Sequence, residues 1–251
     1  LWQTMQHKGR MQRSWVEGTA RGLGFLDDYA NFVQALLDLY EATGERDQLA
    51  RAMQVQAAQD AQFWDAAAGG YFATPNDAEI LLARAKPDRD GAEPAGNSVA
   101  ANNLVRLAAM TGADSWRRKA VATWRSVADR LAHHPFLLTE MLLGVESQQW
   151  PLREVGLVRA AGAPLSATRP FLAVLRDHYM PHRVLLHAEV GEPLEALARL
   201  APIVTGKVAR DGKPTAYVCQ GGVCRLPTTD PAVFRQLLLE GTPAADPSRG
   251  R

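Results

Sequence analysis

The sequence predicts a mainly α-helical fold, in which helical hairpins of an incomplete α/α toroid are followed by a small α/β domain. The first observation is an internal repeat: Thr43-Gly44 recurs as Thr111-Gly112, an offset of 68 residues (111 − 43). The second is that polar segments occupy equivalent places in the two copies. The third is a βαβ pattern after Trp150. Stacked hairpins with polar ends at one rim suggest a toroid or solenoid with a cleft along that rim.

Each copy of the repeat has the pattern of a helix, a Thr-Gly stop and a second helix. The offset also places Leu36, Leu39 and Ala52 over Leu104, Leu107 and Ala120. Apolar residues recur at helical spacing in residues 26 to 40, and a second helix is expected over residues 47 to 64. The second hairpin covers residues 97 to 131, and a further helix residues 136 to 146. Before the first hairpin, residues 1 to 15 are interpreted as a short helix and an extended piece.

The predicted domain boundary lies near residue 150. Residues 1–150 would form the helical-hairpin portion, residues 151–240 the small α/β domain, and residues 241–251 a disordered tail. Buried strands are expected at residues 155–158 and 184–187, with a helix between them. A hairpin over residues 215–225 and a last helix over residues 231–240 follow.

Composition excludes several classes of protein. Lys and Arg total 28 and Asp and Glu total 27, so the net charge of +1 argues against nucleic-acid and membrane-surface partners. No apolar run approaches the roughly 20 residues that cross a bilayer. Two cysteines favour a reducing compartment, so we expect a cytoplasmic protein. The chain starts within a predicted element, which suggests a fragment of a longer protein.

The first candidate segment holds Asp27, Asp28 and Tyr29 at the start of the first predicted helix. Acids at a helix start commonly accept backbone N–H groups, and we weigh that capping role above chemistry. Adjacent acids beside an aromatic ring at a cleft rim are also suited to bind sugar hydroxyls or to act as a general acid or base. Both interpretations stay open at this point.

The second candidate segment lies at the equivalent place in the other copy and contains Asp90, Glu93, Asn97 and Ser98. Asn97 or Ser98 would cap the following helix. In the functional interpretation, Asp90 faces Asp28 across the cleft, because glycoside cleavage needs two opposed carboxylates.

Other chemistry receives little support. Tyr71, after the turn Gly69-Gly70, would stack on a sugar ring if it lies at the rim, although aromatic residues are more often core. The six histidines show no metal-ligand spacing, and Gly22-Leu23-Gly24 does not lead into a phosphate loop. We therefore expect no metal and no cofactor.

Cys219 and Cys224 flank Gly221-Gly222 and would face each other across the predicted hairpin. Their spacing is not that of a Cys-x-x-Cys redox motif. A labile disulfide is one alternative. Two free, partly buried thiols are the expectation for a cytosolic protein.

The order of motifs resembles the C-terminal portion of the YyaL-type, or spermatogenesis-associated, thioredoxin-domain-containing family. The motifs are Phe25-Leu26-Asp27-Asp28-Tyr29-Ala30, Gly69-Gly70-Tyr71-Phe72, residues 90 to 100, Ala216-Tyr217-Val218-Cys219 with Cys224, and Thr229-Asp230-Pro231. The resemblance implies a thioredoxin-like domain before this chain. It also implies an α/α toroid similar to N-acylglucosamine 2-epimerases and six-hairpin glycosidases.

The sequence departs from the family's pattern at three places. Asp27 stands where the family usually has Glu, Ala95 replaces a usual Ser, and Glu93 falls at an open position. The histidines that epimerases use for proton transfer have no evident counterparts, so the resemblance does not extend to epimerase chemistry.

Three functions follow from these observations. The first is a carbohydrate-binding or carbohydrate-processing cleft with a sugar ligand, with Asp28 and Asp90 as acid/base groups; its substrate-binding residues would be Asp27, Tyr29, Tyr71, Glu93, Asn97 and Ser98. The second is a non-catalytic scaffold that docks the thioredoxin-like domain and its client proteins. The third is a redox regulator acting through Cys219 and Cys224.

Overall fold

The computed structural model describes residues 2–7, 9–79 and 82–240. The chain divides into two compact units, Leu1–Pro151 and Leu152–Arg251, and each is described by itself. The disordered tail expected at residues 241–251 lies outside the described residues.

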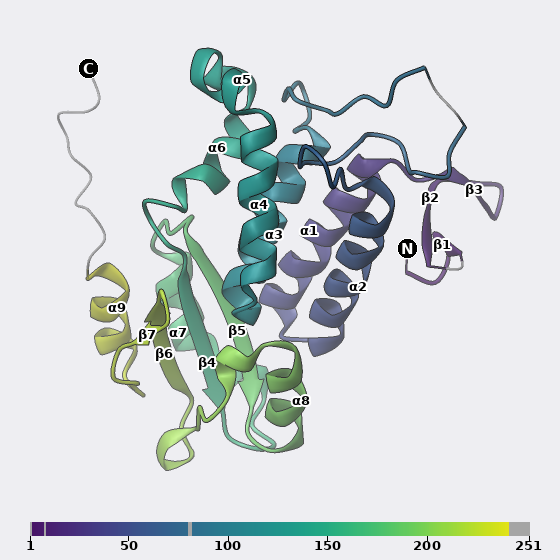
Figure 1. The fold of residues 1–251 in the computed structure, drawn as a ribbon. Helices are drawn as coiled ribbons and strands as arrows, with labels where there is room; N and C mark the ends of the chain where they lie inside the picture. The colour runs from purple at the N-terminus through teal and green to yellow at the C-terminus, as the bar shows by residue number, and fades with distance from the viewer. Residues whose placement is uncertain (1, 8, 80–81, 241–251) are drawn as a thin grey trace. The chain divides into compact units, whose positions relative to one another are not determined.

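The first unit opens with a three-stranded antiparallel sheet, where the sequence predicted a helix over part of residues 1 to 15. Its strands are β1 (Gln6–His7), β2 (Arg10–Val16) and β3 (Thr19–Leu23), in that order (Figure 1). The turn between β2 and β3 places Glu17 and Gly18 in the left-handed region, with φ of 49° and 77°. Two-residue hairpin loops favour this conformation because it matches the twist of the strands. Most side chains of β2 and β3 are exposed, so the alternation of apolar and polar residues that identifies a strand is absent.

The two predicted helical hairpins are present. The first joins α1 (Leu26–Thr43) to α2 (Arg46–Phe63), and the second joins α3 (Gly96–Thr111) to α4 (Asp114–Ser126). The two hairpins also end their first helix with the same hydrogen bonds. Thr43 and Thr111 each donate a side-chain hydrogen bond of 2.7 Å to the carbonyl four residues earlier. Gly44 and Gly112 then end the helices with φ of 70° and 72°, the left-handed conformation that glycine adopts most readily.

Polar contacts join α1 to α3. The Nδ2 atom of Asn103 donates to the carbonyl of Ala30 at 2.8 Å. Arg106 lies 2.7 Å from Asp38 and 3.0 Å from Glu41. The unit is completed by the helices α5 (Ala128–His133) and α6 (Thr139–Glu146).

The second unit contains a four-stranded mixed sheet in the order β5-β4-β6-β7. Its strands are β4 (Arg153–Arg159), β5 (Arg183–Glu189), β6 (Thr215–Gln220) and β7 (Val223–Cys224), and its helices are α7 (Arg169–Arg176), α8 (Glu192–Leu200) and α9 (Pro231–Leu239). The strands β4 and β5 are parallel with α7 between them, as the βαβ pattern predicted. One core contains Phe171 of α7 and Phe234 of α9, whose rings lie 5.4 Å apart. Short 3-10 turns occupy Pro135–Leu137, Leu165–Thr168, Pro202–Val204 and Arg210–Gly212.

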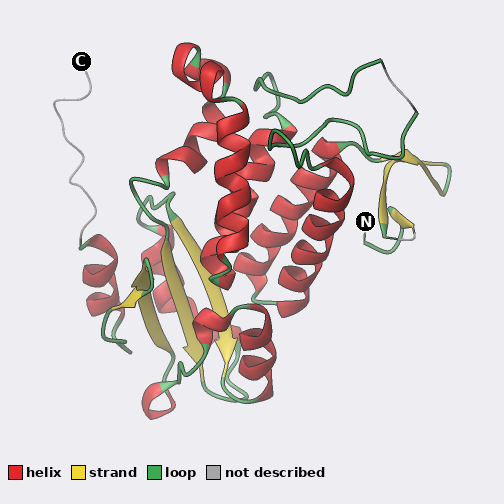
Figure 2. Cartoon of the chain, viewed as in Figure 1, coloured by secondary structure: helices red, strands yellow, loops and turns green. Residues whose placement is uncertain are grey.

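The predicted fold class is therefore wrong. The described residues form a mixed α/β structure with one sheet in each unit, not a mainly α incomplete toroid (Figure 2). The helical hairpins misled the prediction because their stops are strong local signals, whereas the first sheet leaves almost no pattern of burial. Within the described residues, no helix combines the length and the apolarity needed to cross a bilayer.

Candidate functional site

The carboxylate of Asp28 is held at the start of α1. Its Oδ2 atom accepts a hydrogen bond of 2.8 Å from the backbone N–H of Phe25, the residue that precedes the helix. The same oxygen lies 3.1 Å from Nη1 of Arg13 on β2, and the Arg13 guanidinium lies 4.5 Å above the ring of Phe25. Asp28 therefore caps the helix and links it to the first sheet.

Asp27 is placed differently, between the starts of α1 and α3. Partial burial raises the pKa of its carboxyl, and the neighbouring carboxylate of Asp28 raises that pKa further, while the backbone N–H of Gly96 lowers it. A Cβ atom at position 96 would collide with the side chains of Asp27 and Leu26, which would have to shift to accommodate it. The exposed Glu93 adds negative charge nearby. Asp27, Asp28 and Glu93 thus form a carboxylate cluster at the starts of these two helices.

The carboxylate of Asp90 joins two segments of the chain. Its Oδ1 accepts from the backbone N–H of Ala95, and its Oδ2 accepts from the backbone N–H of Glu140, each at 2.9 Å. Its own backbone N–H donates to the carbonyl of Leu137 at 2.7 Å. Asp90 therefore connects the approach to α3 with the first turn of α6.

The other residues predicted to bind substrate are buried. The hydroxyl of Tyr29 accepts from the backbone N–H of Met11 at 2.9 Å. Asn97 pairs with the backbone of Tyr71 in both directions, accepting at 2.8 Å and donating at 2.9 Å, and it also donates to the carbonyl of Pro87. Ser98 is fully buried, and its hydroxyl has no hydrogen-bond partner within the described part of the chain. The side chains of Tyr29, Tyr71, Asn97 and Ser98 therefore belong to the interior of the first unit.

A buried polar network that the sequence did not indicate surrounds Tyr71. Its hydroxyl donates to Oδ1 of Asp60 at 2.7 Å, and Gln56 donates to the same oxygen at 3.0 Å. Nζ of Lys119 on α4 lies 2.5 Å from the second Asp60 oxygen, so the network joins α2 to α4. Burial, followed by the charge of Asp60, raises the pKa of Tyr71 well above its ordinary value. The sequence signal for this network was the aromatic residue Tyr71 directly after Gly69-Gly70.

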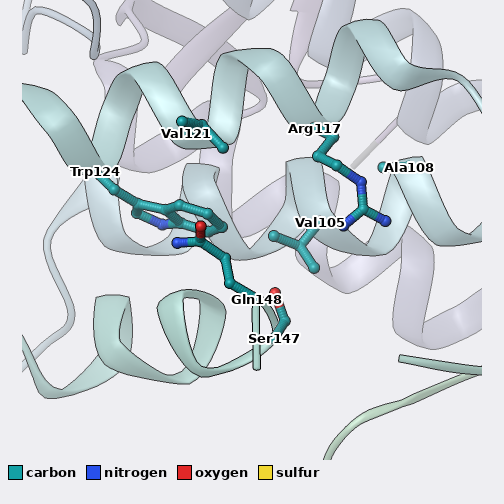
Figure 3. A pocket seen from close by; sticks show the side chains of 7 residues that line it. All are labelled: Val105, Ala108, Arg117, Val121, Trp124, Ser147 and Gln148. Atoms are coloured by element: carbon teal, nitrogen blue, oxygen red, sulfur yellow. The ribbon is translucent and has the colours of Figure 1, made fainter. Parts of the chain in front are cut away.

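Hollows of the first unit also lie away from these residues. One is a cavity of about 190 Å³ between α3, α4 and the segment after α6, where the indole of Trp124 lies beside Gln148 (Figure 3). Another is an open hollow of about 600 Å³ bordered by Lys86, Arg125 and Arg130 and also by the acidic Asp88 and Asp129. The first is smaller than the usual range of ligand sites, roughly 300 to 1,000 Å³.

The two cysteines are joined in a disulfide between β6 and β7, and the expectation of free thiols is corrected accordingly. The hairpin register pairs them directly, because Gly221 and Gly222 form the turn between them with φ of 58° and 83°.

Comparison with known proteins finds relatives in mammals and in a nematode. It is 38% identical over 218 residues to human spermatogenesis-associated protein 20, a match that covers 86% of this chain and 27% of the human protein. The chain is homologous to spermatogenesis-associated protein 20. The rat protein of that name is 38% identical over 242 residues, covering 92% of this chain and 30% of its own length. An uncharacterized protein of Caenorhabditis elegans, B0495.5, is 32% identical over 216 residues, covering 84% of this chain and 28% of its own length.

The chain spans less than a third of the length of these curated relatives and matches the C-terminal part of the spermatogenesis-associated proteins. No protein-family profile matches it.

Proposed function

We propose that this chain is a non-catalytic scaffold segment, which docks a thioredoxin-like domain of a longer protein and presents the client proteins of that domain. The observation that supports this proposal is the use of Asp28 and Asp90 as acceptors of backbone N–H groups. Protonation of either carboxylate during a reaction would weaken those hydrogen bonds and loosen the start of a helix. Both residues therefore suit a structural role better than acid/base chemistry.

The surface that we propose for docking is the hairpin of β2 and β3, which projects from the helices of the first unit (Figure 1). Trp15 and Val16 are adjacent in β2 and point to opposite faces, yet they are 50% and 47% exposed. Leu23 of β3 is 42% exposed. Large apolar side chains on the exposed faces of this small sheet gain by burial, so a partner that covers them would be stabilised on the hairpin.

The edge of β3 offers a second element of recognition. In the described residues β3 pairs with β2 alone, so its other edge presents backbone groups to which an extended segment can add. Backbone pairing at this edge, together with burial of Trp15 or Val16, is a mode of docking that needs no catalytic residue.

The longer proteins to which this chain is similar provide room for such a partner. The chain covers 27% to 30% of the human and rat proteins. The resemblance of its motifs implies that a thioredoxin-like domain precedes it, and docking would place that domain beside the client proteins.

A carbohydrate-binding cleft is the second candidate function, and the observation that favours it is the carboxylate cluster. A carboxyl group with a raised pKa is what a general acid requires, and Asp27 lies beside Asp28 and Glu93. In this candidate Asp27 and Glu93 would contact the sugar directly, because the other proposed ligands are buried.

A binding titration separates the two candidates. The thioredoxin-like domain of a full-length relative, expressed alone, is titrated into this chain and into the double variant W15S/V16S. The scaffold proposal expects binding that the double variant weakens by at least about 10-fold, or about 1.4 kcal/mol. The control is V223S, an equally simple change at a 72% exposed valine of the second unit.

A sugar screen is the other half of the experiment. The chain and its D27N variant are tested against a panel of mono- and oligosaccharides by calorimetry. Saturable sugar binding that D27N abolishes, with no binding of the thioredoxin-like domain, would replace the scaffold by the carbohydrate candidate.

A further inference from the structure

A polar cluster in the second unit leads to an inference that does not depend on the proposed docking role. Cys219 of β6 lies directly opposite Cys224 of β7, and a disulfide joins them. Side chains alternate along a strand, so Cys219 faces away from Val218, which belongs to the core beneath α7 and α9. The disulfide thus lies on the face of the sheet opposite that core.

The two sulfur atoms differ in their access to solvent. Cys219 is 2% exposed, whereas Cys224 is exposed on a two-residue strand at the edge of the sheet. Its neighbour Val223 is 72% exposed. Cys224 is therefore the cysteine of the pair that an approaching thiol reaches more readily.

A lysine side chain lies against both sulfur atoms. Nζ of Lys207 is 3.9 Å from Sγ of Cys219 and 3.8 Å from Sγ of Cys224. The stem of Lys207 packs over Gly156, where a Cβ atom would lie 3.5 Å from its Cδ, in ordinary van der Waals contact. The ring of Tyr217 lies 5.0 Å from the ammonium group. The cation is therefore held in place on two sides.

The remaining charges around the disulfide are mixed. Glu154 of β4 pairs in register with Cys219, and its charge raises the pKa of Lys207, opposing the larger lowering that burial causes. Arg225 directly follows Cys224 in the chain and lies close enough to Arg153 to lower the pKa of that residue, after burial. Positive groups beside a cysteine favour its thiolate form, which is both the nucleophile and the leaving group in disulfide exchange.

We propose that the Cys219–Cys224 pair is a thiol–disulfide exchange site for a dithiol partner, with Lys207 as the positioning residue that stabilises the departing thiolate. A thiolate of the partner attacks Sγ of Cys224, a new S–S bond forms, and the Cys219–Cys224 bond breaks. The electron pair of the broken bond leaves on Sγ of Cys219, beside Nζ of Lys207. The second thiol of the partner loses its proton to water and attacks the partner's own sulfur in the mixed disulfide, which releases Cys224.

The exchange is balanced in electrons and protons. Two electrons pass from the partner to the protein, so the partner ends as a disulfide and the protein as two thiols. The two protons that the partner gives up are taken from water by Cys219 and Cys224. The reverse reaction would oxidise a dithiol pair in this chain at the expense of the partner's disulfide.

The test measures the rate at which the disulfide of the native chain is opened by reduced dithiothreitol at pH 7. At successive times, free thiols are blocked with iodoacetamide and the mass of the chain is measured by mass spectrometry. We expect K207Q to slow opening by about 3- to 10-fold, and K207R, which keeps the positive charge, to restore most of the rate. The matched control is K213Q, at an exposed lysine of the same unit, which should leave the rate unchanged.

A second measurement keeps the proposal falsifiable if K207Q does not fold. In a C219S variant, oxidised glutathione should form a mixed disulfide on Cys224, whereas in C224S the buried Cys219 should stay unmodified. The rate of disulfide opening is then compared for reduced thioredoxin and dithiothreitol at equal concentration. The comparison shows whether the partner is a protein dithiol or a small one, and reaction with either supports the proposal. Opening of the disulfide only in denaturant, equal rates for K207Q and the unaltered chain, or modification of Cys219 rather than Cys224 would overturn it.

Discussion

At the scale of single residues, Asp90 shows how far local reasoning reaches. The sequence assigned Asp90 to a cleft opposite Asp28 and the capping of the following helix to Asn97 or Ser98, whereas Asp90 itself accepts from the backbone N–H of Ala95. Its second partner, the backbone N–H of Glu140, is 50 residues away in the sequence. No local pattern reveals a partner at that distance, so the role of Asp90 in joining α3 to α6 required the structure.

Removal of the Asp90 carboxylate should destabilise the chain. Asp90→Ala leaves two backbone N–H groups without their acceptor, and each loss costs about 1–3 kcal/mol where water does not replace it. We expect urea denaturation to show a loss of about 2–4 kcal/mol. The matched control is Asp129→Ala, at a side chain that is 96% exposed, and its effect should stay within about 0.5 kcal/mol. Equal effects of the two substitutions would contradict the assigned role.

The titration of Asp65 provides a prediction about pH. The hydrogen bond from Lys86, at 2.6 Å, and the backbone N–H groups of Ala67 and Ala68 lower the pKa of Asp65 from 3.8 to about 2. Because the folded-state pKa is lowered, the stabilisation is fully present above about pH 4 and is lost as the pH falls through about 2. Carboxyl-carbon NMR should give a midpoint near 2 for Asp65. Lys86→Gln should move that midpoint upward, and an unchanged midpoint would show that the lysine is not the cause.

At the scale of elements, the sequence predicted those features that local chemistry determines. The Thr-Gly stops of α1 and α3 were correct because a threonine side chain and a left-handed glycine end a helix without help from elsewhere. The sheet of β1 to β3 was missed because its side chains are exposed on both faces and leave no alternation. Its turn at Glu17-Gly18 was the available signal, although glutamate is uncommon in the left-handed region.

The repeated stops predict matched effects of mutation. Gly44→Ala and Gly112→Ala each place a Cβ atom in the left-handed conformation, which costs about 1–2 kcal/mol. No neighbouring atom lies near the new Cβ at Gly112, so conformation alone sets that cost. Urea denaturation should give similar losses for the two variants and little change for Gly91→Ala, where φ is not in that region and the nearest atom to a new Cβ would be 3.9 Å away. A loss of stability in only one of the two variants would show that the two helix stops do not contribute equally to the free energy of unfolding.

At the scale of the whole molecule, the sequence located the βαβ pattern of the second unit but not the fold class. The prediction weighed the helical repeat most heavily and missed the three-stranded sheet of the first unit. The antiparallel pairing of β4 with β6 joins strands separated by two helices, and hydropathy gives no information on such a partner. For the candidate site, the repeat located the two polar helix starts, and the grouping of Asp27, Asp28 and Glu93 there is a finding of the structure. The contacts that hold Tyr71, Asn97 and Asp90 come from distant segments.

The central claim is that the hairpin of β2 and β3 docks a thioredoxin-like domain. Hydrogen exchange of this chain, measured with and without that domain of a full-length relative, tests the claim most directly. We predict slower exchange of the backbone amides of Thr19–Leu23 when the domain is present, because the free edge of β3 becomes paired or covered. Two results would contradict the claim. One is unchanged amide exchange throughout the hairpin at a saturating concentration of the domain. The other is protection, on addition of a sugar, that is confined to the backbone amides around the carboxylate cluster.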